Sequence, residues 1–62
     1  MAYVFDFITP EGVIDHFHLG AFRDDRDALT QAEADLLATT IAASVEVWRG
    51  PERLGRIEAP AR

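Results

Sequence analysis

The sequence predicts an α+β domain in which one helix connects two β-hairpins, giving the element order ββαββ. Residues 3–22 and 45–58 alternate β-branched or aromatic side chains with other residues, whereas residues 23–40 are rich in Ala, Leu, Glu and Gln and lack Gly and Pro. A chain of 62 residues is long enough for only one domain. We expect residues 1–59 to form that domain and residues 60–62 to be a C-terminal tail.

The first hairpin is expected around a three-residue loop from Pro10 to Gly12. Proline has the backbone angle that the first central turn position requires, and glycine can adopt the left-handed conformation that closes such a loop. This loop would pair Phe5 with Phe17, so the odd-numbered residues of both strands would form the buried face. The even-numbered residues would then share the opposite face, where Asp6 would lie across from His16.

The helix is expected to begin after Asp24, whose side chain can cap the first turn, and to end between residues 39 and 43. The acidic residues of this first turn suit the helix dipole, which stabilises negative charge there. The helix should cover the buried face of the sheet with one apolar stripe and two flanking apolar residues. The stripe comprises Leu29, Ala32 and Leu36, and the flanking residues are Leu37 and Ile41.

Residues 45–49 and 54–58 are expected to form the second hairpin, which turns at the Gly-Pro pair between them. Val45 and Val47 would point to one face, and Glu46 and Trp48 to the other. Because the helix connects strand two to strand three by a crossover, the third strand is expected beside the first and antiparallel to it. The predicted order of the four mainly antiparallel strands is therefore 2-1-3-4.

Four segments, "YVFDF", "TPEG", "DDRDALTQAEADLL" and "VEVWRG", together cover most of the chain. Their order resembles that of a group of short uncharacterised bacterial proteins, frequent in alphaproteobacteria. These proteins open with a similar strand and continue with a glycine-containing turn, an acidic helix start and a closing "VEVW" type strand. The resemblance implies a ββαββ fold and a bacterial source. It implies no activity, because the group is a domain of unknown function.

Six arginines, no lysine and eleven carboxylates give a formal net charge of −5, which disfavours binding to a nucleic acid. Arg49, Arg53 and Arg56 would be a basic patch within this acidic chain, unless they pair with the neighbouring Glu52 and Glu58. The chain has no cysteine, no signal-peptide pattern and no apolar stretch of membrane-spanning length. We expect a cytoplasmic protein that does not bind membranes.

Nucleophilic side chains and phosphate-binding motifs are scarce in this sequence. There is no cysteine nucleophile, Ser44 is the only serine, and the glycines form no phosphate-binding motif. We therefore expect no enzymatic activity, no catalytic residues and no cofactor. A metal site is one interpretation of the two histidines, since His16 and His18 would lie on one face of a strand with Asp6 as a third ligand. The alternative interpretation is an ordinary hydrated sheet face with a cross-strand Asp–His pair.

A docking surface is the main functional expectation, because a small domain without disulfides gains stability by covering an apolar face. We expect a non-enzymatic interaction module that forms a homodimer or docks a protein partner. The contact would use the face of the sheet that the helix leaves open, or an edge strand. The alternatives are an antitoxin-like acidic regulator that neutralises a basic protein, and a small metal-binding protein. The expected interaction face comprises Val4, Ile8, Ile14, His16, His18 and Trp48.

Overall fold

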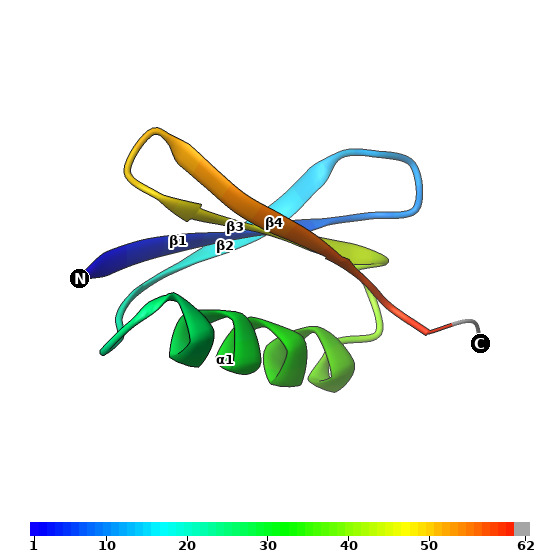
Figure 1. Ribbon diagram of the computed structural model, residues 1–62. Helices are drawn as coiled ribbons and strands as arrows, with labels where there is room; N and C mark the ends of the chain where they lie inside the picture. The colour runs from blue at the N-terminus through cyan, green and yellow to red at the C-terminus, as the bar shows by residue number, and fades with distance from the viewer. Residues whose placement is uncertain (61–62) are drawn as a thin grey trace.

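A computed structural model describes residues 1–60 and contains a four-stranded antiparallel sheet with one helix packed on one of its faces (Figure 1). The strand order β2-β1-β3-β4 and the antiparallel pairing confirm the predicted ββαββ fold. The expected tail extends to residues 61 and 62, which lie outside the described residues. The elements are β1 (Ala2–Ile8), β2 (Ile14–Ala21), α1 (Asp25–Ala38), β3 (Ser44–Arg49) and β4 (Glu52–Glu58).

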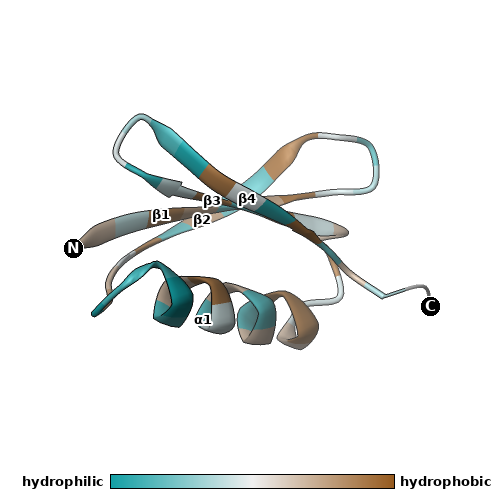
Figure 2. Ribbon diagram, viewed as in Figure 1, coloured by the Kyte–Doolittle hydropathy of each residue, from teal (hydrophilic) through white to brown (hydrophobic). Residues whose placement is uncertain are grey.

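The core lies between α1 and the two central strands. The sheet contributes aromatic and aliphatic side chains from alternate positions of β1 and β3, as the alternating patterns of both strands predict, and α1 contributes alanines and Leu36. Figure 2 shows the helix changing from hydrophilic at its first turn to hydrophobic at its last turn. The core residues are Tyr3, Phe5, Phe7, Ala28, Ala32, Leu36, Ala42, Val45 and Val47.

The helix begins as predicted, because Asp24 is the N-cap and its Oδ1 accepts a 2.9 Å hydrogen bond from the backbone N–H of Asp27. Its end was predicted too late: α1 ends at Ala38, and Thr39 already has extended backbone angles. The flanking apolar positions were also wrong. Leu37 and Ile41 are 58% and 55% exposed, because the narrow contact with the sheet is filled by small alanines and Leu36.

The loop of the first hairpin matches the prediction. The backbone N–H of Thr9 donates a 2.8 Å hydrogen bond to the carbonyl of Val13, and Gly12 has the left-handed φ of 86°. Ile8 accordingly pairs with Ile14. The register of residues nearest the turn is therefore the expected one.

A β-bulge then shifts the register by one residue, so the predicted pairing of Phe5 with Phe17 is wrong. The register shift lies between Phe7 and Ile8, and Phe7 pairs with His16 while Phe5 pairs with His18. One extra residue in β2, Asp15, is inserted at this point. Because successive strand residues point to opposite faces, the insertion turns every later side chain of β2 to the face opposite the predicted one.

Gly20 makes room for an aromatic side chain at the far end of β2. Phe22 stacks on Phe5 with ring centroids 5.4 Å apart and meets Tyr3 edge to face at 5.8 Å. A Cβ atom on Gly20 would lie only 2.8 Å from Cε2 of Phe22. The absent side chain therefore allows Phe22 to fold back over β2 and close the core at this end.

Polar contacts join the first turn of α1 to the sheet. Asp25 accepts hydrogen bonds from the hydroxyl of Tyr3 at 2.7 Å and from the guanidinium of Arg49 at 2.9 and 2.7 Å. Burial and the hydrogen bond to Asp25 raise the pKa of Tyr3 to about 12. The hydrogen bond from Tyr3 lowers the pKa of Asp25, and the hydrogen bonds that Arg49 donates to Glu52 and Asp25 raise the pKa of Arg49.

Candidate interaction surface

The face of the sheet that points away from α1 carries the candidate site, and we call it the open face. Its residues follow from the strand register, because positions that alternate with the core residues point to the opposite side. The apolar members are Val4, Ile8, Ile14, Phe17, Leu19 and Trp48, and the charged members are Asp6, Glu46, Arg53, Arg56 and Glu58.

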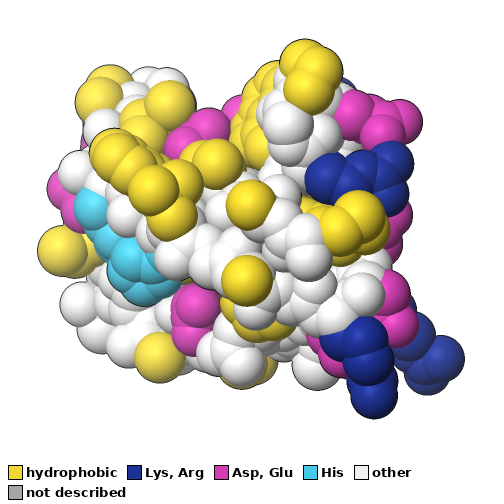
Figure 3. All heavy atoms as spheres, turned by 90° about the vertical axis from the view of Figure 1, so that its left-hand side faces the viewer, with side chains coloured by type: hydrophobic (Ala, Val, Ile, Leu, Met, Phe, Trp, Pro, Cys, Tyr) yellow, Lys and Arg dark blue, Asp and Glu magenta, His cyan; other side chains and the backbone are white. Residues whose placement is uncertain are grey.

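Large apolar side chains on β2 are the most exposed part of the open face. Leu19 is 72% exposed, Phe17 is 59% exposed and Ile14 is 53% exposed. Figure 3 views the molecule from the end at which β1 begins, and hydrophobic side chains gather above the two histidines with acidic side chains beside them. Such a group of apolar residues with a polar border is typical of a contact surface.

A shallow hollow of about 480 Å³ adjoins this apolar group at the end of the sheet where β1 begins. Its lining is mostly apolar, and Val4 and Leu19 contribute to it from paired positions of β1 and β2. The remaining lining residues are Ala2, Tyr3, Gly20, Ala21 and Gly50. The hollow is open enough to receive an apolar side chain from outside the chain.

Two carboxylates face each other in the middle of the open face. Asp6 on β1 pairs directly with Glu46 on β3. Oε2 of Glu46 accepts a 2.7 Å hydrogen bond from Arg53, which neutralises that carboxylate. Among residues 1–60, Asp6 makes no side-chain hydrogen bond or ion pair. Within the described part of the chain, Asp6 is therefore a negative charge without a cation, and Phe17 on the neighbouring strand borders it.

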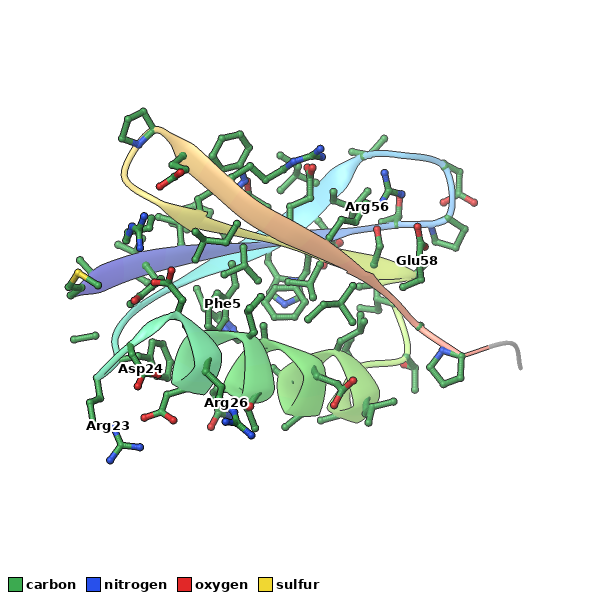
Figure 4. The ribbon with its side chains drawn as sticks, viewed as in Figure 1. Phe5, Arg23, Asp24, Arg26, Arg56 and Glu58 are labelled. Atoms are coloured by element: carbon green, nitrogen blue, oxygen red, sulfur yellow. The ribbon has the colours of Figure 1, made fainter. Side chains whose placement is uncertain are left out.

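Among the described residues, Arg49, Arg53 and Arg56 do not form a free basic patch. Arg49 contacts Asp25 and Glu52, Arg53 contacts Glu46, and Arg56 lies 3.2 Å from Glu58. Figure 4 shows Arg56 and Glu58 on the side of β4 that faces away from α1. Pairing with Glu52 and Glu58 was one interpretation of the sequence, and the ion pairs of Arg49 and Arg56 confirm it, whereas Arg53 pairs with Glu46 on β3.

His16 and His18 do not lie on the open face, contrary to the prediction. The bulge turns both toward the helix side, where the ring of His16 stacks on Phe7 at 4.6 Å and the ring of His18 meets Phe7 at 5.0 Å. Nδ1 of His16 lies 2.8 Å from Asp15, and Nδ1 of His18 lies 3.8 Å from Asp35. The histidines therefore cover the edge of the core.

Asp6 cannot join the histidines as a metal ligand, because it lies on the opposite face of the sheet. The predicted cross-strand pair of Asp6 with His16 is wrong for the same reason, and Phe17 occupies that position. Within residues 1–60, no three His, Cys, Asp or Glu side chains come together in a group suited to a metal ion.

The remaining predicted residues of the interaction face lie on the open face, and they differ in accessibility. Val4 pairs with Trp48 across β1 and β3, and both side chains are partly buried. Ile8 is only 7% exposed, whereas Ile14 is largely exposed. The indole N–H of Trp48 is buried and has no hydrogen-bond partner among the described residues.

Phe17 and Leu19 were missed because the predicted register placed them in the core. The available signal was Gly20, since a strand glycine followed two residues later by an aromatic residue fits an aromatic side chain folded over the strand. That arrangement requires Gly20 and Phe22 to face the core, and it leaves Leu19 on the open face.

The edge of β2 adds backbone groups to the same surface. Met1 and Phe22 exchange both backbone hydrogen bonds, each 3.0 Å long. In an antiparallel ladder, every second residue bonds to the partner strand, so the N–H and C=O groups of Phe17 and Leu19 point to the free edge. The other edge strand, β4, is interrupted by a register shift and carries charged residues.

Comparison with family models, curated proteins and solved structures finds no match for this chain. No helix among residues 1–60 has the length and apolar character needed to cross a membrane.

Proposed function

We propose that this protein is a small non-enzymatic interaction module whose open face is buried against another protein surface. The observation that carries the proposal is the exposure of Phe17 and Leu19, which the bulge turns away from the core. Each large aliphatic or aromatic side chain gains about 1.5–3 kcal/mol when it is fully removed from water. A second copy and a different protein are both candidate occupants, and an antitoxin-like role toward a basic protein belongs to the second class.

The positions of Phe17 and Leu19 on the sheet make them better candidates for a contact surface than the other exposed apolar residues. Leu37 and Ile41 are as exposed as Phe17, but they lie on α1 and in the segment after it. Phe17 and Leu19 instead adjoin Val4, Trp48 and an apolar hollow, so one partner can cover them together. Contact surfaces are built around such clustered apolar side chains.

The test is native purification of the tagged chain from its own cells, with mass spectrometry of co-purifying proteins and light scattering of the eluted species. The wild type should elute with one stoichiometric protein or at twice the mass of a single chain. Leu19→Asn should abolish that association, because it places a polar group in the contact.

Leu37→Asn is the matched control, since Leu37 has a similar exposed fraction but lies on α1. This variant should associate like the wild type. Equal loss in both variants, or a wild type that elutes as a single chain without a partner, would contradict the proposed function.

A further inference from the structure

We infer that the occupant of the open face is a segment of a different protein that presents an arginine or lysine about 7 Å from an apolar side chain. This inference rests on the proposed function and specifies the chemistry of the partner. The spacing follows from β1: Val4 borders the apolar hollow, and Asp6 lies two residues further along the strand. Two strand residues span about 7 Å.

The apolar part of the partner would enter the hollow between Val4 and Leu19. The hollow holds about 480 Å³, which is within the range of ordinary binding clefts. Leu19 is the most exposed large apolar side chain of those described. An aliphatic or aromatic side chain in this hollow would bury Leu19 together with the partly buried Val4.

The cationic part of the partner would pair with Asp6. Like charges directly opposite each other destabilise a sheet, and Asp6 lies directly opposite Glu46. Glu46 has Arg53 as its cation, whereas Asp6 has none among residues 1–60. A bound arginine or lysine would supply the missing cation. The surrounding apolar residues would exclude water and strengthen this hydrogen-bonded ion pair.

Charge distinguishes this partner from a second copy of the chain. A two-fold face-to-face dimer places the open face against itself, so a dimer whose axis passes close to Asp6 and Glu46 would bring the carboxylates of both copies together. Each copy also carries a formal net charge of −5. The repulsion between these carboxylates and the repulsion between the two net charges oppose self-association through the open face and favour a basic protein.

A selection experiment tests the inference and requires no identified partner. Random dodecapeptides displayed on phage are selected on the immobilised full chain and counter-selected on the Leu19→Asn variant. Enriched peptides should carry Arg or Lys two to four positions from Leu, Ile or Phe. Trp48 is the only tryptophan in the chain and lies on the open face, so its fluorescence reports the binding of a synthetic peptide that lacks tryptophan.

The affinity of one enriched peptide is then measured for the wild type and for two variants with the same loss of charge. Asp6→Asn should weaken binding about tenfold, the effect of losing a hydrogen bond to a charged group. Asp35→Asn is the matched control, because Asp35 lies on α1. Its affinity should equal that of the wild type. Peptides without basic residues, or equal binding by Asp6→Asn and wild type, would overturn the inference.

The remaining outcomes separate this inference from the proposed function. If no peptide is enriched and the chain doubles its mass in a manner that Leu19→Asn abolishes, the inference fails while the proposed function stands. If no peptide is enriched and Leu19→Asn changes neither mass nor co-purifying proteins, both fail.

Discussion

Tyr3 donates a 2.7 Å hydrogen bond to Oδ1 of Asp25 and thereby joins β1 to the first turn of α1. Tyr3 is 1% exposed, and the same carboxylate also accepts hydrogen bonds from Arg49 on β3. These contacts hold the helix start over the two central strands. Because the pKa values of both partners are shifted, the contact makes the stability of the fold depend on pH.

We predict that the fold loses stability between about pH 10 and pH 12. The pKa of Tyr3 is raised from 10.0 to about 12 in the folded chain, so the unfolded chain releases the hydroxyl proton first as the pH rises. The stabilisation is thus complete below pH 10 and is lost as the pH approaches 12. Tyr3 is the only tyrosine, so ultraviolet absorbance follows its ionisation directly. In Tyr3→Phe this loss should vanish; an ionisation near pH 10 in the folded wild type would contradict the prediction.

A second pH dependence is expected on the acid side. The pKa of Asp25 in the folded chain is lowered from 3.8 by the hydrogen bond from Tyr3 and by Arg49. The ionised carboxylate therefore stabilises the fold above pH 3.8, and this stabilisation is lost as the pH falls through the pKa of the folded chain. Thermal unfolding followed by circular dichroism in acidic buffers measures the effect. Asp25→Asn should reduce the slope of Tm against pH, because the amide cannot take up a proton in this range.

Substitution of Leu19 should leave the folded chain intact, as the proposed function requires. Leu19→Asn is expected to change the free energy of unfolding by less than about 0.5 kcal/mol, because the side chain is already in water. Leu36 is 1% exposed, and Leu36→Ala should lower the free energy of unfolding by about 3 kcal/mol because it leaves a cavity in the core. Urea unfolding compares the two variants. A large loss in Leu19→Asn would place Leu19 in the core and not on the open face.

Gly20 and Phe22 should behave as a coupled pair. The Phe22 ring lies 2.8 Å from the ideal Cβ position of residue 20, so Gly20→Ala would push the new Cβ against it. This substitution should lower the free energy of unfolding by about 1 kcal/mol. In a Phe22→Leu background the added methyl group meets a smaller neighbour, so the same substitution should cost less. A double-mutant cycle measures the coupling. Strictly additive effects would show that the two positions do not press on each other.

Relief of the repulsion between Asp6 and Glu46 should be measurable in the isolated chain. Asp6→Asn is expected to raise the free energy of unfolding by about 0.5 kcal/mol, because it removes one of two carboxylates that lie directly opposite each other. Glu46→Gln should gain less, since it also removes the ion pair with Arg53. Added salt should reduce both differences by screening the charges. Destabilisation by Asp6→Asn would indicate that the carboxylate has a structural role.

Local chemistry accounts for the parts of the fold that were predicted from the sequence. Asp24 caps the helix because a short acceptor side chain satisfies a free backbone N–H of the first turn. Gly12 closes the hairpin loop because glycine adopts a left-handed conformation at little cost. Alternation in β3 buries Val45 and Val47 and turns Glu46 and Trp48 to the open face, as predicted.

The candidate site was predicted less well, because its residues depend on the register of β2. Val4 and Trp48 were assigned correctly to the open face, because the pairing of β1 with β3 has no register shift. His16 and His18 were assigned to the wrong face, and Phe17 and Leu19 were assigned to the core. Contacts across the sheet decide between the predicted register, which pairs Phe5 with Phe17, and the observed register, which pairs Phe5 with His18.

The fold class, the strand order, the helix cap and the hairpin loop all follow from local propensities and connection lengths, so they can be read from the sequence. Packing across the sheet, in contrast, selects the side of β2 that faces the core. The bulge at Asp15 lets Phe22 fold over Gly20 onto Phe5, and lets the ring of His16 cover Phe7. Because one inserted residue reverses all later positions of a strand, this packing also determines which side chains remain available to a partner.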